Sequence, residues 1–81
     1  MSDRINEHSI KIMPNPATDH FKVFAEEGSK VSIYNSLGQL VKTGASENRV
    51  AIFQTNDLKP GIYMIRVQKE NEVYSGKILV Q

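Results

Sequence analysis

The sequence contains no cysteine, so it can form neither a disulfide scaffold nor a thiolate metal site. It also lacks an excess of one charge: ten Lys and Arg stand against nine Asp and Glu, a formal net charge of +1. This balance argues against a nucleic-acid-binding protein, because such proteins carry a clustered basic face. The longest uninterrupted apolar runs are three or four residues, too short to span a membrane. A chain of 81 residues is long enough for one domain with a modest core.

The N-terminal segment lacks an apolar stretch of the kind found in a secretory signal. Residues 1–9 are polar and have no periodicity, so we expect them to form a flexible lead-in or linker. We expect residues 10–81 to form the single domain. The missing signal fits either a cytoplasmic protein or a piece of a longer one, and composition does not choose between them.

β-Branched residues dominate the apolar composition. Valine and isoleucine together number fifteen, against four leucines and four alanines. Their stiff side chains lose rotamer freedom in a helix but suit a pleated sheet. Glycine, asparagine and serine recur at short intervals, as turns between short strands require. The composition therefore predicts an all-β fold.

Seven short segments carry the apolar patterns of strands. They lie at 10–13, 21–24, 31–34, 39–42, 50–53, 62–68 and 73–80. Turn residues separate them at intervals of about 8–12 residues, a spacing typical of a β-sandwich of mostly antiparallel strands. In the longest segment we expect Tyr63, Ile65 and Val67 to face the core.

Prolines and glycines mark the corners of this predicted fold. Pro14 and Pro16 have fixed φ angles and no N–H donors, so they predict an extended or turning corner. The five glycines match neither a dinucleotide-binding fingerprint nor a phosphate loop, and we interpret them as turn residues, with a polar loop expected at 44–48. Gly76, inside the last predicted strand, instead indicates a bulge or a close approach of another backbone.

Arrangements of catalytic residues are nearly absent. The two histidines are His8, in the lead-in, and His20, beside Asp19 at the start of a strand. A Ser-His-Asp triad built on His20 and Asp19 is disfavoured, because no serine lies in a Gly-x-Ser-x-Gly elbow and adjacent strand residues point to opposite faces. Two distant histidines do not make a zinc site. We expect no catalytic residue, no metal and no cofactor, and we interpret the chain as not being an enzyme.

Acidic and aromatic residues also favour structural interpretations. Glu26 and Glu27, and Glu70 with Glu72, fall in predicted turns, where solvated charges are a better interpretation than a calcium site, which needs more oxygen ligands in one loop. The position of Tyr63 within a strand favours a core residue. Three residues could in principle stack on sugars or bases: Tyr34, Tyr63 and Tyr74.

Four segments, taken in order, make the sequence resemble a known family. They are residues 13–19 (MPNPATD), 33–41 (IYNSLGQLV), 58–63 (LKPGIY) and 77–81 (KILVQ). They are similar to the blocks of the C-terminal sorting domains (type A) of the type IX secretion system, and they cover nearly the whole chain from residue 10. The family motif residues that we expect to act on the fold are Pro14, Asn15, Pro16, Tyr34, Asn35, Gly38, Leu58, Gly61 and Tyr63.

The resemblance implies a fold and a function. The family fold is an immunoglobulin-like sandwich of seven strands, in agreement with the strand count above. Its members lie at the C-terminus of cargo proteins that enter the periplasm by an N-terminal signal. An outer-membrane type IX translocon recognises the folded domain and delivers the cargo to the cell surface or outside the cell. In many cargos a sortase-like cysteine peptidase then removes the domain and links the cargo to an anionic lipopolysaccharide.

The last predicted strand is the expected recognition element. If one of its edges is exposed, that edge is a template for strand addition, with the Lys77 ammonium and the terminal carboxylate fixing the register. The residues that the translocon would recognise are Lys77, Ile78, Leu79, Val80 and Gln81. A purely structural role, completing a sheet, is the alternative. The same edge could form a homodimer by strand pairing or swapping, and peptidase cleavage should fall in the lead-in, before Ile10.

Other function classes stay open at this point. A fibronectin-like or immunoglobulin-like adhesion or carbohydrate-binding module would share the sandwich, but it should present an exposed aromatic cluster or an acidic loop. A small stand-alone cytoplasmic β protein is a second alternative, and an enzyme is a distant third. We expect neither nucleic-acid binding nor direct membrane insertion.

Overall fold

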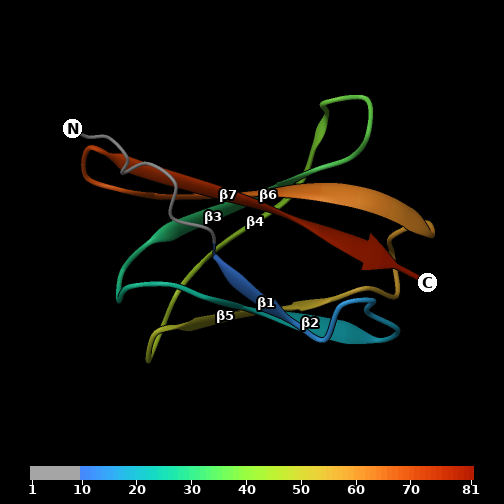
Figure 1. The fold of residues 1–81 in the computed structure, drawn as a ribbon, viewed down its shortest axis with the longest axis horizontal. Helices are drawn as coiled ribbons and strands as arrows, with labels where there is room; N and C mark the ends of the chain where they lie inside the picture. The colour runs from blue at the N-terminus through green and yellow to red at the C-terminus, as the bar shows by residue number, and fades with distance from the viewer. Residues whose placement is uncertain (1–9) are drawn as a thin grey trace.

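The structure is a computed structural model, and it describes residues 10–81. The lead-in expected at residues 1–9 lies outside the described residues. Seven strands follow one another along the chain (Figure 1): β1 (Lys11–Met13), β2 (His20–Phe24), β3 (Lys30–Tyr34), β4 (Leu40–Ala45), β5 (Val50–Gln54), β6 (Gly61–Lys69) and β7 (Glu72–Val80). Each corresponds to one of the seven predicted segments, so the all-β class is confirmed.

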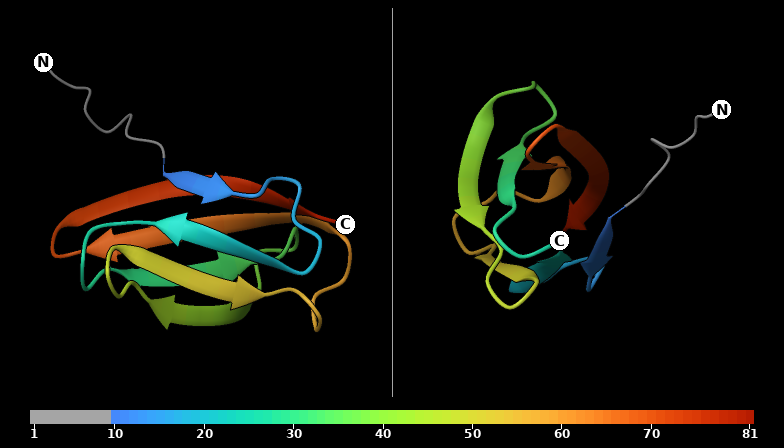
Figure 2. Two further views of the ribbon diagram at one scale, coloured as in Figure 1. Left: turned by 90° about the horizontal axis from the view of Figure 1, so that it is seen from below. Right: turned by 90° about the vertical axis from the view of Figure 1, so that its left-hand side faces the viewer.

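The strands form two sheets that face each other (Figure 2). One sheet has three strands in the order β1-β2-β5, and the other has four in the order β4-β3-β6-β7. Every pairing between neighbouring strands is antiparallel. This arrangement is the immunoglobulin-like sandwich that the sequence predicts. Within residues 10–81 there is no helix long and apolar enough to cross a membrane.

The core lies between the sheets and consists of Ala17 and buried residues of β2, β3, β5, β6 and β7. On β6, Tyr63, Ile65 and Val67 are buried, which confirms the predicted core face. From the other sheet, the rings of Phe21 and Phe53 stack with their centroids 5.6 Å apart. Because side chains alternate along a strand, the residues between these point to solvent, and the burial pattern of β6 alternates accordingly.

Three of the predicted turn glycines, Gly28 among them, have backbone angles that favour glycine. Gly38 has a φ of 82° and Gly61 a φ of 150°, a region in which a side chain is strained. Gly44 differs from the prediction, because it lies within β4 rather than in a loop. A Cβ atom at this position would lie 3.0 Å from the ring of Phe53, so Gly44 makes room for the core.

Gly76 makes room for β1 on the surface of β7. It pairs with Ile65 in an unbroken register, so the predicted bulge is wrong. The predicted close approach is present, but side chains rather than backbone make it. A Cβ atom on Gly76 would lie 2.9 Å from Cγ1 of Ile10 and 3.0 Å from Cδ1 of Ile12. The missing side chain lets the first strand pack against the last.

We expect the substitution Gly76→Ala to destabilise the domain by about 1–3 kcal/mol, the usual cost of inserting a methyl group into a filled space. Urea unfolding of the purified domain measures this change. The control is Ser75→Ala, an exposed neighbour on the same strand, which should change the free energy of unfolding by less than about 0.5 kcal/mol. Equal stability of the two variants would contradict the packing argument.

Candidate functional site

The four motif segments meet at one end of the sandwich, around the start of β6 and the end of β7 (Figure 1). The register places Gly61 opposite Val80 and Tyr63 opposite Ile78. Ala17 forms a parallel bridge with Val80. The hairpin at 35–39 and the turn at 59–61 line a shared recess of about 350 Å³. This end of the domain is the candidate functional site.

The free edge of β7 is covered along the residues expected to be recognised. β7 does lie at the edge of its sheet. However, the Asn15 side chain donates to the Lys77 carbonyl (3.3 Å) and accepts from the Leu79 amide (3.1 Å). The Ala17 amide donates to the Leu79 carbonyl and the Ala17 carbonyl accepts from the Gln81 amide, both at 2.8 Å. The condition of an exposed edge is therefore not met along residues 77–81, since Asn15 and Ala17 already bond to it.

The five terminal residues differ in what a partner can reach. Ile78 and Val80 are buried in the core, at 0% and 2% exposure. Leu79 is half-buried, and Lys77 and Gln81 are exposed. Only the side chains of Lys77, Leu79 and Gln81 are accessible to a partner of the folded domain.

Asn35 organises the hairpin between β3 and β4. Its side-chain oxygen accepts hydrogen bonds from the amides of Leu37 (2.9 Å) and Gln39 (3.0 Å). Its side-chain nitrogen donates to Oε1 of Gln39 at 2.9 Å. These bonds add to the backbone hydrogen bonds of the turn, in which the Asn35 amide donates to the Gln39 carbonyl and the Gly38 amide donates to the Asn35 carbonyl, both at 2.9 Å. Asparagine side chains commonly stabilise turns in this way. Tyr34, the last residue of β3, lies half-buried beside it.

The segment before β6 is fixed by one tyrosine and one ion pair. The Tyr63 hydroxyl donates to the Lys59 carbonyl at 2.6 Å, while half-buried Leu58 packs against the core. Lys42 of β4 lies 2.9 Å from an oxygen of Asp57. The hydrogen bond from Lys42 holds the pKa of Asp57 below its usual value. Pro14 and Pro16 are both exposed at the corner that precedes Ala17.

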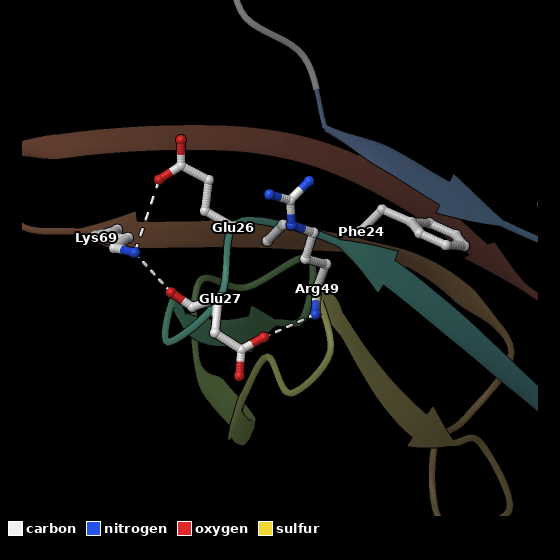
Figure 3. A pocket seen from close by; sticks show the side chains of 6 residues that line it. Phe24, Glu26, Glu27, Arg49 and Lys69 are labelled. Atoms are coloured by element: carbon white, nitrogen blue, oxygen red, sulfur yellow. Dashed lines mark hydrogen bonds and ion pairs between the residues drawn. The ribbon is translucent and has the colours of Figure 1, made fainter.

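A second recess, of about 530 Å³, lies at the opposite end of the sandwich (Figure 3). The Lys69 ammonium donates to the Glu27 carbonyl at 2.6 Å and lies 3.8 Å from Oε1 of Glu26. The Arg49 amide donates to Oε1 of Glu27 at 3.0 Å. Both glutamates lie in a turn, as predicted. Sequence reasoning singled out neither Arg49 nor Lys69, because their positions are 22 and 42 residues from Glu27 and no motif joins them.

The remaining titratable residues considered in the sequence do not come together in one cluster within the part of the chain that the structure describes. His20 Nδ1 lies 3.1 Å from Oδ1 of Asp19 at the surface, and His8 lies outside the described residues. Tyr74 donates its hydroxyl to Glu72 at 2.6 Å, and this hydrogen bond raises the pKa of Tyr74. Among residues 10–81, no group of three or more His, Asp or Glu side chains is placed to hold a metal ion.

One comparison with known proteins gives a match. A family model described as "Secretion system C-terminal sorting domain" matches residues 11–81. A search among curated proteins finds no match. The matched range includes all seven strands and all four motif segments.

The hydrogen bonds of Asn15 predict a measurable effect on the terminal strand. In the variant Asn15→Ala we expect faster hydrogen exchange at the Leu79 amide, which loses its acceptor, and a loss of about 1 kcal/mol in the free energy of unfolding. Amide exchange followed by NMR tests this. Asn56→Ala, at an exposed turn asparagine, serves as the control and should leave Leu79 unchanged. Unchanged exchange in Asn15→Ala would contradict the role of this side chain.

Proposed function

The chain belongs to the family of type IX secretion C-terminal sorting domains, and from this premise we propose how its structure serves sorting. As a sorting signal, the domain interacts with the type IX secretion machinery and directs a secreted cargo to the cell surface or the medium. The family is one of sorting signals rather than of catalysts.

We propose that the outer-membrane translocon recognises the folded domain at the end where the motif segments meet. The observation that carries this proposal is the convergence of all four segments on the end of β7. Lys77, Leu79 and Gln81 supply the reachable side chains, whereas Ile78 and Val80 hold the strand in the core. On this proposal the domain folds in the periplasm and meets the translocon afterwards, since the recognised end exists only in the folded domain.

A sortase-like cysteine peptidase then removes the domain, on this proposal, at a bond before Ile10. The described fold supports this position, because the side chains of Ile10 and Ile12 pack over Gly76 and β1 pairs with β2 from Lys11 onward. A protease needs a segment of chain free of such pairing.

The fold does not favour the alternative of a carbohydrate-binding module. Such a module needs an exposed aromatic platform. Tyr63 is buried, and Tyr34 and Tyr74 are each half-buried. Tyr34 faces away from the core beside Met64, whereas Tyr74 packs against the core, so the three rings do not form one surface.

A reporter fusion tests recognition of the terminal strand. We expect a periplasmic reporter carrying residues 1–81 at its C-terminus to reach the surface of a host with type IX machinery. Deletion of residues 78–81 should leave the reporter in the periplasm, but it also removes two core residues. The sharper variant is Lys77→Ala combined with Gln81→Ala, two exposed positions, which should abolish surface delivery while changing stability by less than about 1 kcal/mol.

The control for this test separates recognition from folding. Val23→Ala leaves a cavity in the core, where Val23 is 0% exposed, and should cost about 1–3 kcal/mol while the terminal residues stay intact. This variant should still be delivered at a temperature at which it remains folded. Normal delivery of the Lys77/Gln81 variant would overturn recognition through these residues. A wild-type fusion that stays in the periplasm would overturn the sorting function itself.

Mass spectrometry of the released domain tests the position of cleavage. We expect the released fragment to contain residues 10–81 complete and to begin at or before Ile10. A fragment that begins inside β1 or later would contradict the proposal, because the peptidase would then have cut paired backbone.

A further inference from the structure

One face of the domain carries apolar side chains and positive charge without a partner in the described structure. This surface, called here the outer face, is the side of the four-stranded sheet turned away from the core. Cross-strand pairing places Leu40, Tyr34 and Met64 in one row, and Ile62 lies beside Leu79 in the next. Leu40, Ile62 and Met64 are 55%, 47% and 39% exposed. Contiguous apolar residues of this kind mark interaction surfaces.

The charged residues of the outer face are all cations. The alternation along β3, β6 and β7 places three of them on it: Lys30, Arg66 and Lys77. The four strands of the sheet contain a single carboxylate, Glu72, which accepts the hydroxyl of Tyr74. No ion pair among residues 10–81 involves Lys30, Arg66 or Lys77. The face therefore combines an apolar centre with an unbalanced charge of +3 from these cations.

The outer face continues into the recess of about 350 Å³ at the candidate functional site, since Ile62 belongs to both. Exposed Leu37, at the tip of the hairpin, lines the other side of this recess. An apolar centre bordered by charged residues, with an adjoining recess, has the anatomy of a protein–protein interface. The recess offers a place for one large side chain of a partner, the usual position of the residue that contributes most to binding.

We propose that the outer face binds a protein of the secretion machinery through a surface that is both acidic and apolar. This inference rests on the sorting function proposed above. Charge complementarity selects the partner, because carboxylates on that surface would pair with Arg66 and Lys77 while apolar side chains cover Ile62 and Met64. A second copy of this domain is disfavoured, since an isologous contact would bring two sets of cations together.

The other sheet supplies matched controls. It also has exposed apolar residues on its solvent side, including Met13 at 45% and Ile52 at 56% exposure, but Lys22 lies between them in the cross-strand register. The apolar surface there is interrupted. Ile52 therefore matches Ile62 in chemistry and exposure, and Lys22 serves as an exposed cation outside the outer face.

The first experiment compares these positions in the reporter fusion. We expect Ile62→Thr and Arg66→Glu each to reduce the amount of reporter on the cell surface by about tenfold, the effect of losing one good contact. Ile52→Thr and Lys22→Glu should leave the amount of surface reporter unchanged. Urea unfolding should show that Ile62→Thr and Ile52→Thr have similar stability. The same should hold for Arg66→Glu and Lys22→Glu. If the wild type is delivered and Ile62→Thr and Arg66→Glu are delivered equally well, the inference is overturned while the sorting function stands. If the wild type is not delivered, both this inference and the sorting function fail.

The second experiment identifies the class of occupant. Met64 is replaced by the photocrosslinking residue benzoylphenylalanine in the secreted fusion, with Met13 replaced in the same way as the control. We expect a covalent adduct to a component of the secretion machinery from position 64 and none from position 13. An adduct to a second copy of the domain, or no adduct from a fusion that is delivered, would overturn the inference.

The third experiment tests a lipid surface. The purified 81-residue domain is sedimented with vesicles of phosphatidylglycerol and phosphatidylcholine. We expect no sedimentation that depends on Arg66. Binding to these vesicles that Arg66→Glu abolishes would assign the outer face to an anionic membrane and would overturn a protein partner.

Discussion

The antiparallel pairing of β6 with β7 is the interaction on which the rest of the structure depends. It runs through nine consecutive residue pairs, from Gly61–Val80 to Lys69–Glu72. β6 also pairs with β3, so the four-stranded sheet is held together through it. β7 in turn connects the two sheets, because Gly76 accommodates side chains at the start of the three-stranded sheet and Val80 bridges to Ala17. A chain without disulfides must obtain this connection from packing and backbone pairing, and here the last strand supplies much of it.

The dependence of the fold on β7 determines when its terminal residues can be recognised. Ile78 and Val80 contribute to the core, whereas Lys77, Leu79 and Gln81 alternate with them on the outside. The last strand is therefore presented in one fixed register only when the whole domain has folded. A partner that recognises these outer side chains on a rigid strand distinguishes a folded domain from an unfolded one, because the spacing of the three side chains is set by the sheet.

The strands could be predicted from the sequence because their signals are local. Alternation of apolar residues along β6 and turn residues between strands determine the period and the limits of each element. The contacts that close the site are not local. The Asn15 side chain bonds to Lys77 and Leu79, which lie 62 and 64 positions away in the sequence. The local pattern MPNPATD does not indicate which residues those partners are. The loop predicted at Gly44 is wrong for a related reason: only the position of the Phe53 ring in the other sheet explains why a glycine belongs in β4. The candidate recognition residues themselves came from the family resemblance rather than from periodicity.

The coverage of the β7 edge changes how the terminal strand can be recognised. Strand addition at residues 77–81 would have to displace four hydrogen bonds from Asn15 and Ala17, and the partner would only replace bonds that already exist. A partner that binds the outer face does not have to displace these hydrogen bonds. Lys77 and Leu79 project from it beside Met64 and Ile62, so a partner bound to the outer face contacts the terminal strand through side chains while residues 15–17 stay in place. Recognition of the terminal strand and binding at the outer face therefore involve one surface. The terminal residues form its border, and the apolar centre of the sheet provides the area that a partner buries. The bonds from Asn15 and Ala17 hold β7 in the register that both kinds of contact require.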